Sequence, residues 1–178
     1  MKPRYTALLR GLNVGGHRVK MDHLRGLFEE MGFSAVSTFI ASGNVLFEAA
    51  AGEPAAALEA RIERHLEAAL GYAVATFLRT PEELAAAAAL RPFDGVEDGG
   101  GRTLMVSFHK EPPDAALRAR LDALRTPTDD FRVHAREVYW LTGPRMSESP
   151  VGPQVTKALG AGTMRNATTV RKLAEKLA

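Results

Sequence analysis

The sequence contains no cysteine, which excludes disulfide bonds, thiol catalysis, iron–sulfur clusters and zinc sites built on cysteine. Its apolar runs are short, and none approaches the roughly 18 residues of a membrane-spanning helix. The first residues, MKPRYTALLRGLNVGG, are interrupted by glycines and lack the apolar stretch of a secretory signal. A cytoplasmic protein without a membrane partner is therefore expected.

Familiar catalytic and nucleotide-binding motifs are also missing. The sequence has no Gly-x-Ser-x-Gly, no Gly-x-Gly-x-x-Gly and no P-loop. Its five histidines lie in separate segments, and no two have the spacing of zinc ligands. No metal and no cofactor is expected. Catalytic residues stay unassigned, because the acidic pairs of the sequence are typical of solvated helix faces and loops.

The composition is that of an ordinary globular protein of one large or two small domains: 178 residues, 46% hydrophobic and 25% charged. The abundance of alanine and arginine suggests a GC-rich bacterial genome. Net charge is only +2, but residues 1–25 carry +5 and residues 154–178 carry +4, which leaves −7 for the middle. If the fold brings the two ends together, they form a positive patch that attracts an anion. The alternative is two separate solvated faces.

Apolar periodicity predicts six elements in the first half of the chain. They are a strand over 4–10, a helix over 21–31, strands over 36–41 and 45–48, a helix over 55–70 and a strand over 73–79. This order, β-α-β-β-α-β, is that of the split βαβ or ferredoxin-like arrangement. It predicts four antiparallel strands with two helices on one face.

The second half repeats this order more loosely. The predicted elements are a capped helix over 80–90, a strand over 103–109, a helix over 113–125, strands over 131–134 and 138–142, and helices over 155–159 and 167–177. The segment from 163 to 166 is interpreted as the loop before the last helix. The predicted fold is therefore α+β, with two tandem ferredoxin-like subdomains. They are expected to cover residues 1–80 and 81–178, the second including the C-terminal helix, and to pack as one compact unit.

The loop from Arg10 to Lys20 is the most informative segment, because it joins a predicted strand to a predicted helix and is rich in glycine. Glycines let the backbone approach a ligand, and the N–H groups that begin a helix favour an anion. Arg10 and Lys20 are expected to contact phosphate, and Asn13 to orient the ligand. The alternative is a turn whose glycines serve backbone geometry alone.

Two further segments carry candidate ligand-binding residues. Ser42-Gly43-Asn44 forms the predicted hairpin turn between two strands. Arg165 and Asn166 precede the last helix, where an arginine clamps an anion and an asparagine caps the helix. The predicted ligand-binding set is Arg10, Gly11, Asn13, Gly15, Gly16, Lys20, Ser42, Asn44, Arg165 and Asn166.

These segments also carry a family resemblance. LLRGLNVGGHRVK, ASGNVLFE, LRTPEEL, VYWL and LGAGTMRNATTVRKL together resemble the bacterial domain-of-unknown-function family 1697, over essentially the whole chain. The resemblance implies two ferredoxin-like subdomains and no established enzyme activity. It places signature positions in the glycine loop, at the Ser42–Asn44 turn, and at Thr163, Arg165, Asn166 and Thr169. Ala167 stands where family members usually carry tryptophan, so a site that uses these groups has here either lost a stacking surface or changed its ligand.

Three functions remain open from the sequence. The first is a binding module for a phosphate-bearing ligand, a nucleotide or a nucleic acid, at the loop after the first strand. The second is a structural or homo-oligomeric interaction protein. The third is a small-molecule enzyme with a site between the subdomains, in which Ser42, His17 or His23 reacts. The acidic middle of the chain argues against strong general affinity for nucleic acid.

Overall fold

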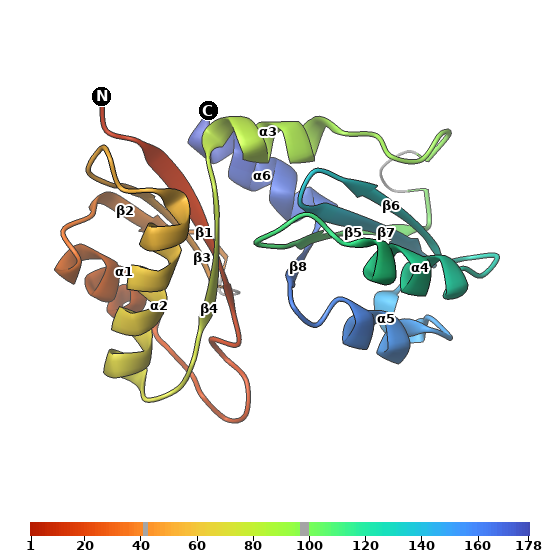
Figure 1. Cartoon of the computed structure of the whole chain (residues 1–178), viewed down its shortest axis with the longest axis horizontal. Helices are drawn as coiled ribbons and strands as arrows, with labels where there is room; N and C mark the ends of the chain where they lie inside the picture. Colours follow the sequence, from red (N-terminus) through yellow and green to blue (C-terminus); the bar gives the residue numbers. More distant parts are fainter. Residues whose placement is uncertain (41–42, 97–99) are drawn as a thin grey trace. The chain divides into compact units, whose positions relative to one another are not determined.

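The computed structural model describes residues 1–40, 43–96 and 100–178, and its elements are labelled in Figure 1. Contacts divide the chain into two units, one of residues 1–85 with 173–178 and one of residues 86–172. Each unit contains a four-stranded antiparallel sheet. The predicted fold class, α+β with two ferredoxin-like sheets, is confirmed.

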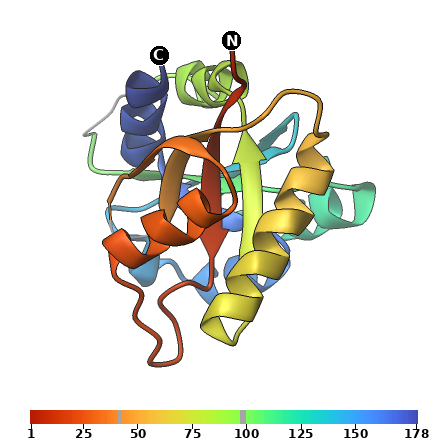
Figure 2. The same cartoon turned by 90° about the vertical axis from the view of Figure 1, so that its left-hand side faces the viewer.

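The sheet of the first unit has the strand order β2-β3-β1-β4, which is the ferredoxin-like order. Its elements are β1 (Arg4–Arg10), α1 (Met21–Glu30), β2 (Ser34–Thr38), β3 (Asn44–Glu48), α2 (Ala55–Leu70) and β4 (Ala75–Arg79). Figure 2 shows α1 and α2 side by side on one face of this sheet. Alternation along β1 turns Ala7 and Leu9 into the apolar core beneath the helices.

The centre of this sheet fixes the position of the glycine loop. β1 pairs with both β3 and β4 and ends at Arg10, so the following loop leaves from the middle of the sheet. The loop returns to the sheet surface where α1 begins at Met21. The Leu9 N–H donates to the carbonyl of Gly43 over 2.8 Å, which brings the predicted hairpin turn against the end of β1.

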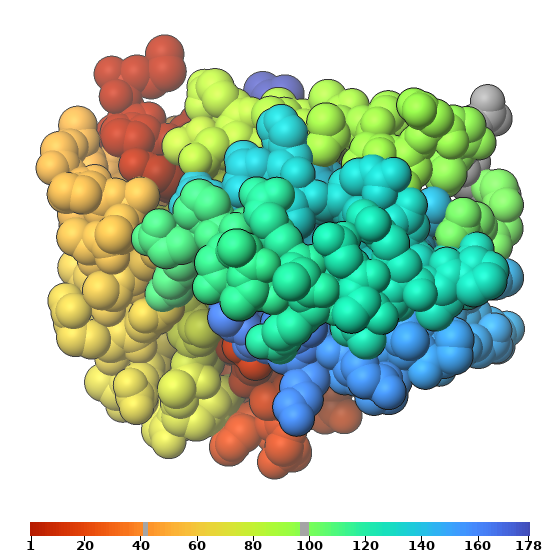
Figure 3. All heavy atoms as spheres, turned by 45° about the vertical axis from the view of Figure 1, so that its right-hand side comes forward, coloured from red at the N-terminus to blue at the C-terminus, as the bar shows by residue number. Residues whose placement is uncertain are grey.

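The second unit repeats the arrangement with the strand order β6-β7-β5-β8. Its elements are β5 (Thr103–Phe108), α4 (Ala115–Ala123), β6 (Asp130–His134), β7 (Glu137–Thr142), the 3-10 helix η1 (Met146–Glu148), α5 (Gly152–Ala158) and β8 (Thr163–Asn166). Figure 3 shows the atoms of α4, in blue-green, and α5, in blue, against one another. They cover a core that includes Phe131, Val138 and Trp140.

Two helices have residues in both units: α3 (Pro81–Ala89) and α6 (Ala167–Leu177). The predicted capping box begins α3, since Thr80 N–H donates to Glu83 Oε2 over 3.0 Å and Glu83 N–H donates to Thr80 Oγ1 over 3.2 Å. Near the end of α6, Arg4 Nη1 donates to the carbonyl of Leu177 over 2.7 Å. This bond fixes the C-terminal residues to β1 of the first unit.

Three predicted elements are corrected by the structure. The segment 163–166 is not a loop but the strand β8, which pairs with β5 at the edge of the sheet. A strand of four residues at a sheet edge is too short to be identified from the alternation of apolar and polar residues. The second strand occupies Ser34–Thr38 rather than 36–41, of which residue 41 lies outside the described residues. The helix predicted over 155–159 begins earlier, at Gly152, with proline at its start.

Candidate functional site

The glycine loop is exposed but held in a defined conformation. Leu12 is buried, and its carbonyl accepts a hydrogen bond from the Tyr72 hydroxyl over 2.6 Å. The His17 ring stacks on the ring of Tyr72, with centroids 3.8 Å apart and planes 18° apart. Asn13 Oδ1 accepts the Val19 N–H over 2.9 Å and closes the loop on itself. The loop is therefore anchored at both ends, which leaves its tip in solvent.

Two of the loop glycines are required by the backbone. Gly15 and Gly16 have φ angles of +62° and +85°, in the left-handed region. A residue with a side chain lowers the stability of the fold by about 1 kcal/mol or more in this region, whereas glycine does not. A Cβ built on Gly16 would meet no atom within 4 Å, so the angle and not the space selects glycine. Backbone geometry thus accounts for both glycines without a ligand.

The charges around the loop are positive. A depression of about 390 Å³ lies between the loop, the start of α1 and the end of α2. Arg18, Lys20, His17 and His23 line it, and the described lining residues include no aspartate or glutamate. Within the described part of the chain, neither Arg18 nor Lys20 forms an ion pair. Their fixed charges therefore face solvent and attract anions.

The depression also meets the N-terminus of α1. Lys20 occupies the capping position with extended backbone, and its side chain makes no capping hydrogen bond. Backbone N–H groups in the first turn of a helix are open to an anion under these conditions. Asp22 lies in the same turn, and its carboxylate is directed to Arg25 at 3.6 Å with a 90% exposed side chain.

Other predicted residues of the first unit have different surroundings. Arg10 is exposed at the end of β1, opposite Ala75 of β4. Asn44 is fully buried, and its Nδ2 donates to the Phe39 carbonyl over 2.9 Å, which closes the hairpin turn. Ser42 lies outside the described residues. Asn44 therefore supports the hairpin, whereas Arg10 presents its charge to solvent.

Arg165 and Asn166 belong to the second unit, on β8. Arg165 is only 7% exposed, and its Nη1 donates to Thr163 Oγ1 and to the Met164 carbonyl, both over 2.9 Å. Burial lowers the pKa of Arg165 to about 10. Asn166 Oδ1 accepts the Thr168 N–H over 2.9 Å and caps the start of α6. The predicted residues thus form two sets, one in each unit.

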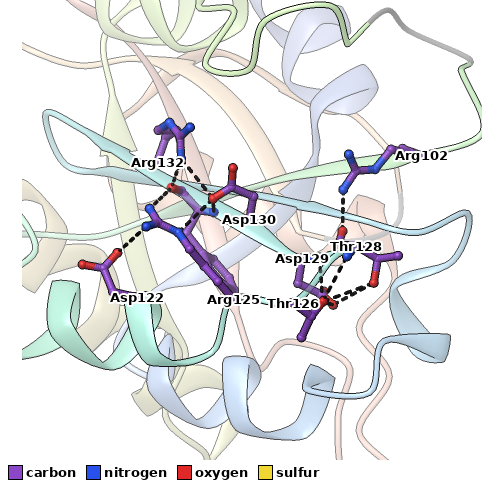
Figure 4. A network of polar contacts seen from close by, with 9 residues as sticks. Arg102, Asp122, Arg125, Thr126, Thr128, Asp129, Asp130 and Arg132 are labelled. Carbon is purple, nitrogen blue, oxygen red and sulfur yellow. Dashed lines mark hydrogen bonds and ion pairs between the residues drawn. The ribbon is translucent and has the colours of Figure 1, made fainter.

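Sequence reasoning missed a polar network in the second unit, shown in Figure 4. Asp129 is 1% exposed and accepts hydrogen bonds from hydroxyl groups and from the Trp140 indole. Beside it, Asp130 Oδ1 accepts from Arg125 at 2.9 Å and from Arg132 at 3.0 Å. The sequence signal was only a pair of adjacent aspartates, which is typical of a solvated loop.

A serine–histidine pair was also missed. Ser107 Oγ on β5 and Nε2 of His109, the residue that follows β5, lie 3.0 Å apart, and the residues are 1% and 5% exposed. A Cβ built on Gly162 would lie 2.7 Å from His109 Cε1, so the ring is packed directly against that backbone. The pair is sealed from solvent, and a substrate does not reach it in this conformation. Among the described residues, no group of three His, Asp or Glu side chains is placed to hold a metal ion.

Comparison with known proteins adds family and fold. A family model described as "Protein of unknown function (DUF1697)" matches residues 2–139. The solved structure of the conserved bacterial protein SP0830 from Streptococcus pneumoniae is similar, with a TM-score of 0.78, 22% sequence identity and coverage of 99% of each chain. At this identity the likeness establishes the fold. The curated proteins offer no match. In the described part of the chain, no helix has the length and apolar character needed to cross a bilayer.

Proposed function

Because the chain belongs to the DUF1697 family, which is described only as proteins of unknown function, we propose a function from its geometry: it binds a phosphate-bearing ligand, a nucleotide or a nucleic acid, at the glycine loop. One observation carries the proposal. The side chains of Arg18 and Lys20 face a depression without an acidic lining residue among those described, beside the uncapped start of α1.

The chemistry of this depression suits a phosphate group. Two fixed cations and the N–H groups of a helix terminus act on the same small volume, and each favours an oxyanion. Arg10, at the end of β1, adds a third exposed cation on the same loop. The stacked rings of His17 and Tyr72 line the depression beside the charges. A nucleobase favours such a surface, because its ring stacks on aromatic side chains.

Among the remaining predicted residues, Asn13 and Asn44 support this site indirectly. Asn13 is the positioning residue, since its side chain holds the loop closed through Val19. Asn44 keeps the hairpin turn against the end of β1, where the loop starts. Arg165 and Asn166 are placed in the second unit, and their side chains are hydrogen-bonded within β8 and the start of α6.

Fluorescence anisotropy tests the proposal with short labelled single-stranded RNA, single-stranded DNA and duplex DNA, at about 50 and 200 mM salt. Unlabelled mononucleotides compete in the same assay. Arg18→Gln and Lys20→Gln should each weaken binding and reduce its salt dependence by about one released counterion. Arg64→Gln, an exposed arginine on α2, is the matched control and should bind like the unaltered protein. Equal affinity of all four proteins, or no binding at the lower salt, contradicts the proposal.

A further inference from the structure

The second unit contains a cavity of its own, and a predicted site residue, Asn166, lines it. Its volume is about 110 Å³, and it lies among the segment that follows α3, the start of β5 and the start of α6. Three arginines from these segments line it: Arg91, Arg102 and Arg171. No aspartate or glutamate is found among its described lining residues. Three like charges that line one small volume favour an anion within it.

Two of these arginines are held in place by carbonyl groups. Arg91 Nη1 donates to the carbonyls of Ala88 and Leu90, at 3.2 and 3.3 Å, at the end of α3. Arg102 donates from Nε to the Thr142 carbonyl over 3.3 Å and from Nη2 to the Thr128 carbonyl. In the described structure, Arg91 Nε and Nη2 and Arg102 Nη1 make no hydrogen bond to protein. Both guanidinium groups are therefore oriented and keep donors for a ligand.

Three carboxylates, those of Asp94, Asp129 and Asp130, line the adjoining depression, which shares Arg102 with the cavity. Asp130 accepts from Arg125 and Arg132, and Asp129 accepts from hydroxyl groups and the Trp140 indole, as Figure 4 shows in part. None of these three carboxylates lines the cavity itself.

The rest of the lining adds apolar walls and a few polar groups. Phe93 and Leu141 are 8% and 2% exposed, and they line the cavity with Leu104. Apolar walls lower the local dielectric, which strengthens the attraction between the arginines and an anion. Asn166 and Thr168, at the start of α6, supply uncharged donors and acceptors at the rim.

We propose that this cavity is a binding site for the phosphate group of a small phosphate monoester, separate from the glycine loop. Arginine forks match the paired oxygens of a phosphate, and a phosphate monoester brings two negative charges to this cationic lining where a carboxylate brings one. The cavity accommodates the head group. The apolar walls of Phe93, Leu104 and Leu141 contact the first carbons of the ester.

Isothermal titration of the full chain at pH 7.5 tests this site, with phenyl phosphate as probe and benzoate as the singly charged compound with the same ring. Phenyl phosphate should bind at least about tenfold more tightly than benzoate. Arg91→Gln and Arg171→Gln should each lower the affinity for phenyl phosphate by about tenfold, the effect of losing one charged hydrogen bond. Arg120→Gln, on α4 outside the cavity, is the matched control and should bind as the unaltered protein does. Thermal unfolding of each variant verifies that it folds.

The glycine-loop variants separate this site from the proposed function. Lys20→Gln removes a charge from the glycine loop and none from the cavity, which Lys20 does not line, so the phenyl phosphate binding that Arg91→Gln weakens should persist in it. If Lys20→Gln abolishes phenyl phosphate binding while Arg91→Gln leaves it intact, the cavity is not the site and the glycine loop is. If the Arg91 and Arg120 variants bind alike, or if benzoate binds as tightly as phenyl phosphate, the cavity proposal is wrong whatever the loop binds.

Discussion

The indole Nε1 of Trp140 donates a hydrogen bond to Oδ1 of Asp129 over 2.9 Å, and each residue is only 1% exposed. The same oxygen accepts from Thr142 and Ser149 at 2.8 Å. The second oxygen accepts from Thr126 at 2.7 Å. A single carboxylate therefore joins the turn before β6, the strand β7 and the segment before α5. The hydrogen bonds that it accepts connect these segments and stabilise the second unit.

Replacing Asp129 with alanine should lower the free energy of unfolding by about 3 kcal/mol, because several buried donors lose their acceptor at once. Urea denaturation at pH 7 measures the change, and Trp140, the single tryptophan of the chain, reports it by fluorescence. Asp122→Ala is the control. Its carboxylate is 62% exposed and pairs with Arg125 at 3.2 Å, so this substitution should lower the free energy of unfolding by less than about 1 kcal/mol. Equal effects of the two substitutions would show that the network contributes little.

The network also predicts acid sensitivity. Burial by itself raises the pKa of Asp129, but the hydrogen bonds from Trp140 and three hydroxyl groups outweigh it and hold that pKa below the ordinary value of 3.8. The folded state thus binds the proton less readily than the unfolded state. The stabilisation is complete above the ordinary pKa and is lost as pH falls through the lower, folded pKa.

Denaturation of the unaltered protein and of Asp129→Asn between pH 7 and pH 2 measures this dependence. The asparagine variant should be less stable at pH 7, and its stability should fall less steeply below about pH 4. Asp122→Asn, with its exposed carboxylate, should retain the acid dependence of the unaltered protein. Parallel curves for all three proteins would rule out Asp129 as a source of the acid sensitivity.

The fold was accessible from the sequence where long apolar periods coincide with strong end signals. The predicted helices over 55–70 and 167–177 agree with α2 and α6, because each has an apolar stripe that repeats over three turns or more. β8 was missed because its pairing with β5 arises between segments about 60 residues apart. Pairing between strands this far apart in the sequence gives almost no signal in the residue pattern of a four-residue strand.

The candidate site was accessible only in part. The glycine loop could be predicted from local sequence, because Gly15 and Gly16 indicate that the backbone of this segment needs positive φ angles. The cavity of Arg91, Arg102 and Arg171 depends on three segments that meet only in the folded unit, and each arginine alone is typical of a solvated surface. Burial of Asn44 was likewise not foreseeable from its hairpin motif.

Gly43 should resist substitution more than any helical glycine. Its φ is +83°, and a Cβ there would lie 3.1 Å from the Cβ of Leu9. Gly43→Ala should therefore destabilise the first unit by about 1–3 kcal/mol, from both strain and crowding. Gly26→Ala is the matched control, since Gly26 lies inside α1 with no atom within 4 Å of its Cβ position. It should stabilise the protein by about 0.5–1 kcal/mol. Thermal unfolding distinguishes the opposite signs, and a shift of the same sign in both would refute the argument.

Substitutions of Asn13 distinguish the effect of the loop's conformational order on binding from the effect of its charge. Asn13 Oδ1 accepts the Val19 N–H, and alanine removes that acceptor, so hydrogen exchange of the Val19 amide should become about fivefold to tenfold faster. Aspartate at the same position keeps the acceptor and should preserve the slow exchange. It also places a negative charge on the loop that carries Arg18 and Lys20.

The two substitutions therefore predict opposite orders in two measurements. Asn13→Asp should protect the Val19 amide better than Asn13→Ala, yet bind labelled single-stranded nucleic acid more weakly at low salt, because its added charge repels phosphate. High salt should reduce the difference in affinity and leave the difference in exchange. If affinity instead follows amide protection in both variants, loop order alone governs binding, and the proposed role of the loop's positive charge is wrong.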